Sequence, residues 1–332
     1  MIIRENYLKK MIDAKDTDFI KVITGMKRTG KSTLLLMFRD YLLANGVKEE
    51  NIVHINFESA KYDDIKDYKD LYKYIEDKVK DEKIYLLLDE IQSVSSWEKA
   101  INSFKVDFNM DIYITGSNAY LLSSELSTLL SGRYIEIKMY PLSFKEFLVF
   151  NNVGSPISTK KISDYLNSNK VVQKSNHQTI DNYLNMLEKS YIIYKADRTD
   201  VKSKSLLKTL GKYYVSDSGI RNIILGFRNI NEGHLLENIV YLELLRRGYR
   251  VNIGKIGDYE AHFVAENPHT IRYYQVAQSI SDEDVRVREI RSLENIPDNY
   301  EKIILSMDKS INNDYNGIKV RNIISWLLDS EE

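Results

Sequence analysis

The sequence of 332 residues contains no cysteine. This absence excludes disulfides, thiolate metal sites and cysteine nucleophiles. A surplus of charge of one sign is also missing, because 47 Lys and Arg residues against 48 Asp and Glu residues give a formal net charge of −1. Overall charge therefore does not draw the chain to nucleic acid or to an anionic membrane, and any such binding needs a local patch.

Long hydrophobic runs are missing as well. No stretch approaches the roughly 18 uninterrupted apolar residues typical of a membrane-spanning helix, and residues 1–16 contain no apolar signal-peptide core. We therefore expect a cytoplasmic protein without membrane contact. The length suggests two or three domains.

The first 150 residues alternate short apolar runs with helical patterns, which predicts right-handed crossovers and a parallel sheet. A linker is expected at 151–156, then a helical segment, and from residue 231 a second α/β pattern. We expect three domains, at 1–150, 151–228 and 229–332. The five expected strands of the first domain are 19–24, 51–57, 84–89, 111–117 and 134–139.

Residues 25–32, GMKRTGKS, match the phosphate-loop pattern G-x-x-x-x-G-K-S/T and lie between an expected strand and an expected helix. The glycines allow backbone N–H groups to surround phosphate oxygens. Lys31 would neutralise the β- and γ-phosphates of ATP, and the Ser32 hydroxyl would bind Mg²⁺. The residues expected around the nucleotide are Gly25, Lys27, Arg28, Thr29, Gly30, Lys31, Ser32 and Thr33.

Two acidic residues, Asp89 and Glu90, follow the apolar run 84–88. At the carboxyl end of a buried central strand, Asp89 can reach Mg²⁺ at the phosphate loop. Glu90 can then polarise an attacking water. This pair favours hydrolysis of ATP over transfer of its phosphate to another acceptor.

Further polar residues are expected near the same sheet edge. A side chain after the strand 111–117 would contact the γ-phosphate or the water, and the sequence does not choose between Ser117 and Asn118. Arg133 could act as an arginine finger on the nucleotide of a neighbouring subunit in a homo-oligomer, or it could pair with a local carboxylate. Neither Gln92 nor Arg28 receives an individual role.

Four stretches together resemble the prokaryotic AAA+-type ATPases of the archaeal-ATPase-like branch: 19–35, 85–101, 112–134 and 141–147. The resemblance implies a P-loop NTPase parallel-sheet domain, then a winged helix, then a restriction-endonuclease-like α/β domain related to PD-(D/E)xK nucleases. It makes Lys31 and Ser32 the Walker A contacts and Asp89 and Glu90 the Walker B pair. It also makes Ser117 or Asn118 the sensor, and Arg133 the family's Gly-Arg position.

The middle segment resembles a winged helix, with helices at 157–166 and 177–190 and a lysine-rich hairpin as the wing. Its six basic residues face two acidic ones, Asp197 and Asp200, which leaves an excess of four positive charges suited to DNA phosphates. A protein-docking or lid module is the alternative. The six basic residues are Lys195, Arg198, Lys202, Lys204, Lys208 and Lys212.

In the C-terminal segment, the nuclease resemblance points to a degenerate site. Glu237 is present, but His262 replaces the metal-binding Asp, and Gln275 stands where an acid precedes the catalytic lysine. Too little negative charge remains for Mg²⁺, although Glu260 would share a strand face with His262. We expect a scaffold or nucleic-acid-binding remnant. A zinc site formed by His262 and His269 is not expected, because no further ligands converge on them.

These patterns predict a protein that binds ATP and Mg²⁺ and couples hydrolysis to movement of the two later domains, with DNA as a candidate partner. The alternative is a nucleotide-gated DNA-binding regulator with little turnover.

Overall fold

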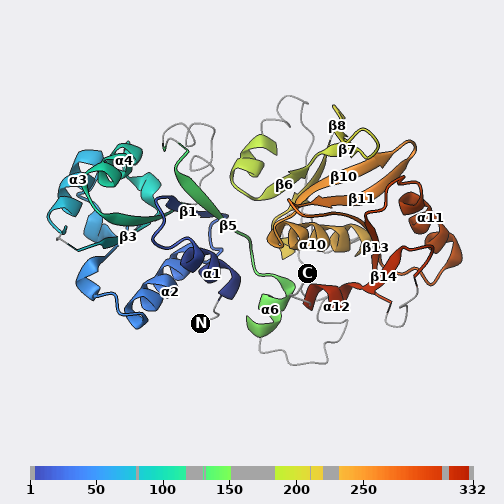
Figure 1. Ribbon diagram of the computed structural model, residues 1–332, viewed down its shortest axis with the longest axis horizontal. Coiled ribbons are helices and arrows are strands. Elements are labelled where there is room, and N and C mark those ends of the chain that lie inside the picture. Colours follow the sequence, from blue (N-terminus) through green and yellow to red (C-terminus); the bar gives the residue numbers. More distant parts are fainter. Residues whose placement is uncertain are drawn as a thin grey trace. The chain divides into compact units, whose positions relative to one another are not determined.

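The computed structural model of the protein describes residues 4–79, 82–116, 130, 132–150, 184–209, 211–219, 232–308 and 314–328. The chain forms two compact units (Figure 1). One runs to Pro141 and includes Lys189–Tyr191, and the other comprises Leu142–Glu188 and Ile192–Glu332. The three-domain division stays a prediction, because much of 151–228 lies outside the described residues.

The first unit contains a five-stranded sheet in the order β2-β3-β4-β1-β5, with every neighbouring pair parallel. All carboxyl ends therefore lie at one edge, and β4 separates β1 from β3. The expected strands are confirmed to within two residues at each end. They are β1 (Ile20–Gly25), β2 (Ile52–Asn56), β3 (Ile84–Asp89), β4 (Met110–Thr115) and β5 (Tyr134–Met139).

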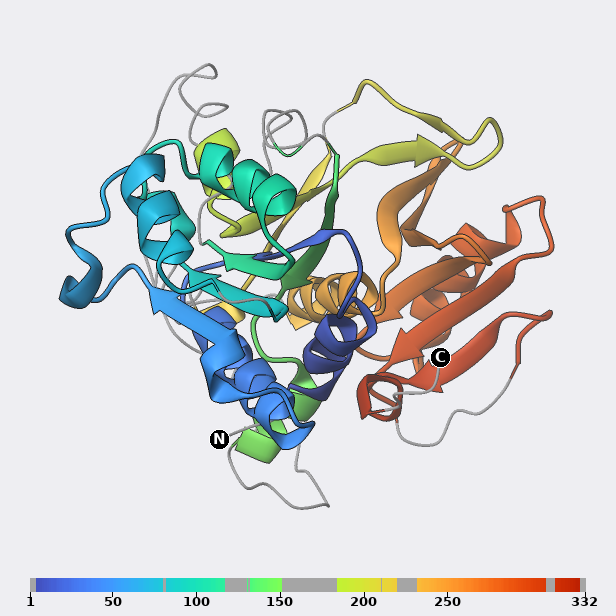
Figure 2. The same cartoon turned by 60° about the vertical axis from the view of Figure 1, so that its left-hand side comes forward.

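Helices cover both faces of this sheet, as expected for parallel strands. Leu34 and Phe38 of α2 pack with Leu87 on one face, while Leu86 and Phe104 belong to the core on the other. Figure 2 shows α1 and α2 on one side of the strands and α3 and α4 on the other. The helices are α1 (Glu5–Asp13), α2 (Lys31–Ala44), η1 (Glu49–Asn51), η2 (Ala60–Tyr62), α3 (Tyr68–Glu76), η3 (Ile91–Ser93) and α4 (Trp97–Asp107).

The second unit contains a mixed seven-stranded sheet in the order β14-β13-β12-β11-β10-β7-β8, and β6 pairs with β9 separately. From residue 232 onward the elements follow the order helix, three strands, helix, two strands and helix, which agrees with the second α/β pattern expected from residue 231. The strands are β6 (Ile193–Ala196), β7 (Arg198–Asp200), β8 (Ser205–Leu206), β9 (Lys212–Val215), β10 (Arg250–Ile256), β11 (Tyr259–Glu266), β12 (Ile271–Ala277), β13 (Glu301–Ser306) and β14 (Lys319–Asn322).

Alternate residues of β11 and β12 face opposite cores. Val264 and Tyr273 pack with Leu293 of α11, whereas Phe263 contacts the ring of Tyr241 on α10. The helices of this unit are α6 (Phe144–Phe150), α10 (Glu232–Arg246), α11 (Glu283–Glu294) and α12 (Ile323–Leu328). Within the described ranges, no helix is long and apolar enough to cross a membrane.

The expected winged helix lies mostly outside the described residues. The segment 157–166 is not described, and of 177–190 only residues from 184 onward are, with a helix at 184–189. The basic hairpin after Lys195 is described in large part. Its β7 pairs in parallel with β10 and antiparallel with β8, so this hairpin extends the seven-stranded sheet.

Candidate functional site

The turn between β1 and α2 carries the phosphate-loop motif, and its backbone requires glycine at two positions. Gly25 has a φ of 136°, and a Cβ there would lie 2.2 Å from the carbonyl oxygen of Met139 on β5. Gly30 caps α2 with a φ of 92°. Glycine adopts such conformations without steric cost. The loop therefore folds tightly before a helix N-terminus, whose N–H groups favour phosphate.

Lys31 begins α2, and its side chain is folded back over this loop, with only 4% of its surface exposed. Its Nζ donates to the carbonyl oxygens of Gly25 and Met26 at 3.2 and 3.3 Å and lies 3.8 Å from Oε1 of Glu90. Burial lowers the pKa of Lys31, and the charges of Glu90 and Asp89 oppose this effect. A phosphate would be a stronger partner for the ammonium than two neutral carbonyls.

Asp89 ends β3 and is fully buried. The hydroxyl of Thr115, at the end of β4, donates to Oδ1 of Asp89 at 2.5 Å and accepts the backbone N–H of Glu90 at 3.0 Å. Oδ2 of Asp89 is buried without a hydrogen-bond partner among the described residues. Because buried polar atoms are nearly always partnered and Mg²⁺ prefers oxygen ligands, this oxygen fits the role of a magnesium ligand.

Glu90 leaves the strand in the left-handed region, with a φ of 54°, and is 6% exposed. Its Oε2 accepts a hydrogen bond of 2.5 Å from Nε2 of Gln92 in η3. On β2, burial lowers the pKa of His54 while the charge of Asp89 opposes that shift, and the Nε2 of this imidazole has no partner among the described residues. Several polar groups thus gather around the carboxyl end of β3.

The four positions of the expected degenerate nuclease site also come together, in the second unit. His262 Nε2 lies 3.9 Å from Glu237 Oε1, and Gln275 Oε1 accepts the backbone N–H of His262 at 3.1 Å. Lys212 Nζ lies 2.9 Å from Glu260 Oε1 and 3.7 Å from Glu237 Oε2. A lysine ammonium therefore stands between the two carboxylates.

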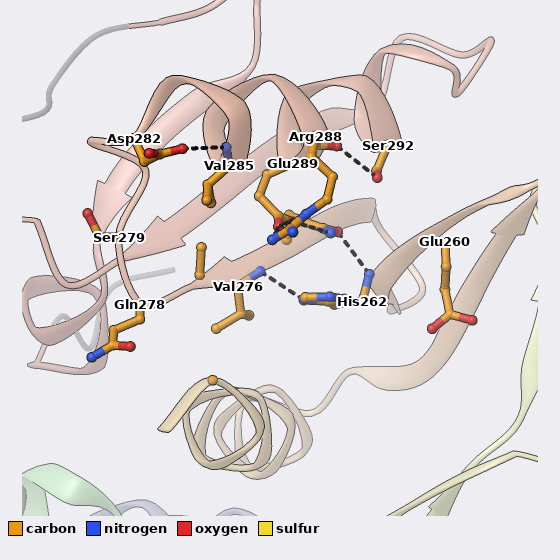
Figure 3. A pocket seen from close by; sticks show the side chains of 13 residues that line it. Glu260, His262, Val276, Gln278, Ser279, Asp282, Val285, Arg288, Glu289 and Ser292 are labelled. Carbon is orange, nitrogen blue, oxygen red and sulfur yellow. Dashed lines mark hydrogen bonds and ion pairs between the residues drawn. The ribbon is translucent and has the colours of Figure 1, made fainter. Parts of the chain in front are cut away.

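His262 and Glu260 line the same cavity, of about 590 Å³, between β11, β12 and α11. Figure 3 shows the His262 ring directed toward Val276, whose backbone N–H donates to Nδ1 at 3.1 Å. Burial lowers the pKa of His262, which the charge of Glu237 opposes. Burial acts to raise the pKa of Glu260, but Lys212 and Arg198 hold it below its ordinary value. Among the described residues, no group of three or more metal-binding side chains converges.

Comparison with known proteins places this architecture in a family. Residues 17–148 match the family described as an AAA domain, and residues 144–231 match a domain of unknown function. An uncharacterized protein of Haemophilus influenzae is 40% identical over 99% of this chain and 99% of its own length. This chain belongs to a family of AAA-domain proteins. Its parallel sheet and phosphate loop form an α/β domain of the P-loop NTPase type.

Other similar proteins are more distant. An uncharacterized protein of Methanocaldococcus jannaschii is 28% identical over 81% of this chain and 78% of its own length. Among solved structures, AMPPCP-bound DnaA from Aquifex aeolicus is 14% identical, covering 57% of this chain and 62% of that one, with a TM-score of 0.32. PCH-2 of C. elegans is 18% identical over 55% of each chain, with a TM-score of 0.28. The chain thus spans less than two thirds of either structure.

Arg4, which precedes the matched residues 17–148, supports the phosphate loop, a role that the sequence did not indicate. Arg4 is 6% exposed, and its guanidinium donates to the carbonyl oxygens of Thr29 and Tyr140, both at 2.9 Å, and of Pro141 at 3.4 Å. It joins the loop to the chain that leaves β5. Carbonyl acceptors carry no sequence signal, so only the fold reveals this role. Thr115 was also missed, although a hydroxyl ending β4 was a usable signal.

The remaining predicted residues of the AAA domain differ in their surroundings. Lys27 is exposed and pairs with Glu58 at 2.9 Å, while Thr33 in α2 is half-buried. Arg28 has a φ of 71°, so its backbone helps to form the loop. Arg133 is exposed and pairs with no carboxylate of the described residues. Ser117 and Asn118 lie outside the described part of the chain.

Three of the six basic residues predicted to contact DNA already have acidic partners. Lys195 lies 2.7 Å from Asp197, Arg198 lies 3.3 Å from Glu260, and Lys212 bridges Glu260 and Glu237 as described above. The other three are exposed and form no ion pair within the described residues. They are Lys202, Lys204 and Lys208.

Proposed function

We propose that this AAA protein hydrolyses ATP to ADP and phosphate with Mg²⁺. The observation that carries the proposal is the convergence of Lys31, Asp89 and Glu90 at one sheet edge. There the lysine has only neutral acceptors at hydrogen-bonding distance, and Asp89 keeps a buried oxygen without a partner. Both features favour an anionic ligand accompanied by a cation.

In the proposed reaction, a water oxygen forms a bond to the γ-phosphorus while the bond from that phosphorus to the bridging oxygen of ADP breaks. The electron pair leaves with ADP, and a proton of the water passes to Glu90. Lys31 neutralises phosphate charge, and Ser32 with Asp89 would hold Mg²⁺, which when bound offsets further phosphate charge. Ser117 or Asn118 as the sensor, and Arg133 acting on a neighbouring subunit, belong to the same proposal.

The test is phosphate release with Mg²⁺ and ATP by the wild type and by Glu90→Gln. Loss of the proton acceptor should lower kcat by at least about 100-fold while ATP binding persists. Glu58→Gln is a matched control, since Glu58 is an exposed carboxylate that contacts only Lys27 of the loop. Equal turnover by the wild type and Glu90→Gln would contradict the assigned role.

We further propose that the middle segment is a winged helix at 151–228, preceding a nuclease-like scaffold at 229–332, and that nucleotide-driven movement of both acts on DNA. Support comes from the exposed Lys202, Lys204 and Lys208, which lie close together in sequence on and beside the β7–β8 hairpin. For the scaffold, support comes from Lys212, whose ammonium lies where two carboxylates would otherwise attract a cation.

Fluorescence anisotropy with labelled duplex DNA tests this part, in ATP, in ADP and without nucleotide. Replacing the three exposed lysines with glutamine should weaken DNA binding. The slope of log K against log salt concentration should also become shallower by about three, because about three fewer counterions are released. Strong binding with little phosphate release would favour the nucleotide-gated regulator instead. If DNA binding were absent or independent of salt, DNA would be excluded as a partner both of the ATPase and of the nucleotide-gated regulator.

A further inference from the structure

Gln92 lies in η3, the single helical turn that follows Glu90, and its amide contacts the carboxylate proposed to accept the proton. Nε2 of Gln92 donates to Oε2 of Glu90 at 2.5 Å, and on the other side Oε1 of Glu90 lies 3.8 Å from Nζ of Lys31. The Glu90 backbone is fixed as well, because its N–H donates to Thr115. The carboxylate is therefore held between an amide and an ammonium.

The orientation of the Gln92 amide follows from this contact. An ionised carboxylate only accepts hydrogen bonds, so the NH₂ group must face it and the carbonyl oxygen must face away. That carbonyl oxygen, Oε1, is buried and has no partner among the described residues. Because the hydrogen bond from Nε2 to Glu90 fixes the amide group, Oε1 of Gln92 stays close to the Glu90 carboxylate. A buried acceptor of this kind is usually paired with water or with a ligand.

We infer that Gln92 is a positioning residue for ATP hydrolysis: its amide N–H holds the Glu90 carboxylate, and its carbonyl oxygen accepts the second hydrogen of the attacking water. One hydrogen of that water faces Glu90 and is transferred to it, and the other faces Gln92 and stays on the oxygen. The oxygen lone pair is then free to form the bond to the γ-phosphorus as the bond to ADP breaks. The inference rests on the proposed ATP hydrolysis.

Two substitutions disturb this role in different ways. Gln92→Met keeps the length of the side chain but removes both donor and acceptor, whereas Gln92→Glu keeps oxygen acceptors and places a second carboxylate against Glu90. Both should lower kcat by roughly 10- to 100-fold. KM and the affinity for a fluorescent ATP analogue should stay within about twofold, because the residue acts on the water and not on bound nucleotide.

A double-mutant cycle distinguishes positioning from a general structural role. If Gln92 acts through Glu90, Gln92→Met should cost less than about threefold in kcat in the Glu90→Gln background, since the group that it positions is already disabled. Ser93→Ala is the matched control, because Ser93 is the exposed neighbour in the same turn. Its kcat should equal that of the wild type.

Each other result overturns the inference. Wild-type kcat in Gln92→Met and Gln92→Glu, a raised KM with unchanged kcat, or a full additive loss in the Glu90→Gln background would each do so while leaving ATP hydrolysis in place. Absence of phosphate release from the wild type, measured alongside, would instead overturn the proposed hydrolysis and this inference together.

Discussion

The protein contains two clusters of carboxylate, amide and cationic groups, one in each unit, and they differ in how their atoms are partnered. Around β3, Asp89 Oδ2 and Gln92 Oε1 are buried with nothing to bind among the described residues, and Lys31 donates only to neutral carbonyls. In the second unit, Glu237 and Glu260 share the Lys212 ammonium.

The amide of the second cluster, that of Gln275, has hydrogen-bond partners on both its oxygen and its nitrogen. Gln275 accepts from the His262 backbone through Oε1 and donates to Glu289 through Nε2 at 2.6 Å. The buried atoms without partners beside it, Nε of Arg198 and the hydroxyl of Tyr214, include no carboxylate oxygen. The same residue types therefore form an open site in one unit and a mutually neutralised network in the other. Residue types alone do not identify a binding site; here the difference lies in carboxylate and amide oxygens that are buried without a partner in the described part of the chain.

Removing the cation from the first cluster should give the largest effect on activity. Lys31→Met should lower ATP turnover by at least about 100-fold, because the loop loses its charge complement to phosphate. Stability should change little, because the burial cost of the ammonium and its 3.8 Å approach to the Glu90 carboxylate oppose each other. A lysine whose pKa is lowered by burial costs folding free energy at pH 7, a cost that disappears only as the pH rises toward 10.5. Phosphate release and thermal unfolding measure the two effects, with Lys66→Met as control, because Lys66 is exposed and lies outside the phosphate loop. If Lys31→Met lost stability but kept its turnover, the cluster around β3 would be a structural network and not an open site.

Arg4 offers the next test, because it is a partnered group that supports the open cluster. Arg4→Met leaves three carbonyl oxygens without their charged donor and should cost about 2 to 3 kcal/mol of unfolding free energy. KM for ATP should rise several-fold as the loop loosens. Arg4→Lys should restore only part of the stability. The lysine ammonium keeps the positive charge, but it reaches fewer of the three carbonyl oxygens than the guanidinium does. Urea unfolding and steady-state kinetics provide the measurement. Wild-type values for Arg4→Met would exclude a supporting role.

Removing the cation from the second cluster should have the opposite outcome from Lys31→Met. Lys212→Met leaves Glu237 and Glu260 unneutralised and should destabilise the second unit by about 1 to 2 kcal/mol, discounted for the partial exposure of the pair. ATP turnover should be unchanged. Lys204→Met, at an exposed lysine without an ion pair among the described residues, is the control in the same unfolding experiment. If Lys212→Met unfolded with the same free energy as the wild type, neutralisation by Lys212 would not be what stabilises Glu237 and Glu260 in the fold.

The sequence predicted the first cluster better than the second for a physical reason. The strands of the AAA domain are marked by continuous apolar runs, and the phosphate loop has fixed spacing, so Lys31, Asp89 and Glu90 were found directly. Arg4 donates to backbone carbonyl oxygens, which leave no spacing pattern. Thr115 and Gln92 contact the side chains of Asp89 and Glu90, and their positions in the sequence do not by themselves specify those contacts.

The charges of the second unit show the same limit. Counting basic residues from Lys195 onward suggested a DNA-binding patch, but Arg198 and Lys212 pair with Glu260, which is roughly 60 and 50 residues away in sequence. A local count does not include partners brought by β11. The convergence of Glu237, His262 and Gln275 came from the family resemblance, whereas their neutralisation by Lys212 required the fold.

The smallest expected effect concerns pH and the imidazole of the second cluster. Nδ1 of His262 accepts from Val276, and burial lowers the pKa of His262 against the opposing charges of Glu237, Glu289 and Glu260 and with the help of Lys212. Above about pH 6.5 the imidazole is neutral in both folded and unfolded chains and contributes nothing. Below that pH the unfolded chain takes up the proton first, so stability is lost as the pH falls toward the folded pKa.

His262→Asn keeps an oxygen that can accept from Val276 but removes the titrating group. The unfolding free energy of the wild type relative to that of the variant, measured from pH 7.5 to pH 5, should therefore fall as the pH falls. If the wild type instead gained relative stability on acidification, Glu237 would be drawing a proton onto the imidazole. The cluster would then be able to change its charge near neutral pH, and its description as a mutually neutralised network would fail.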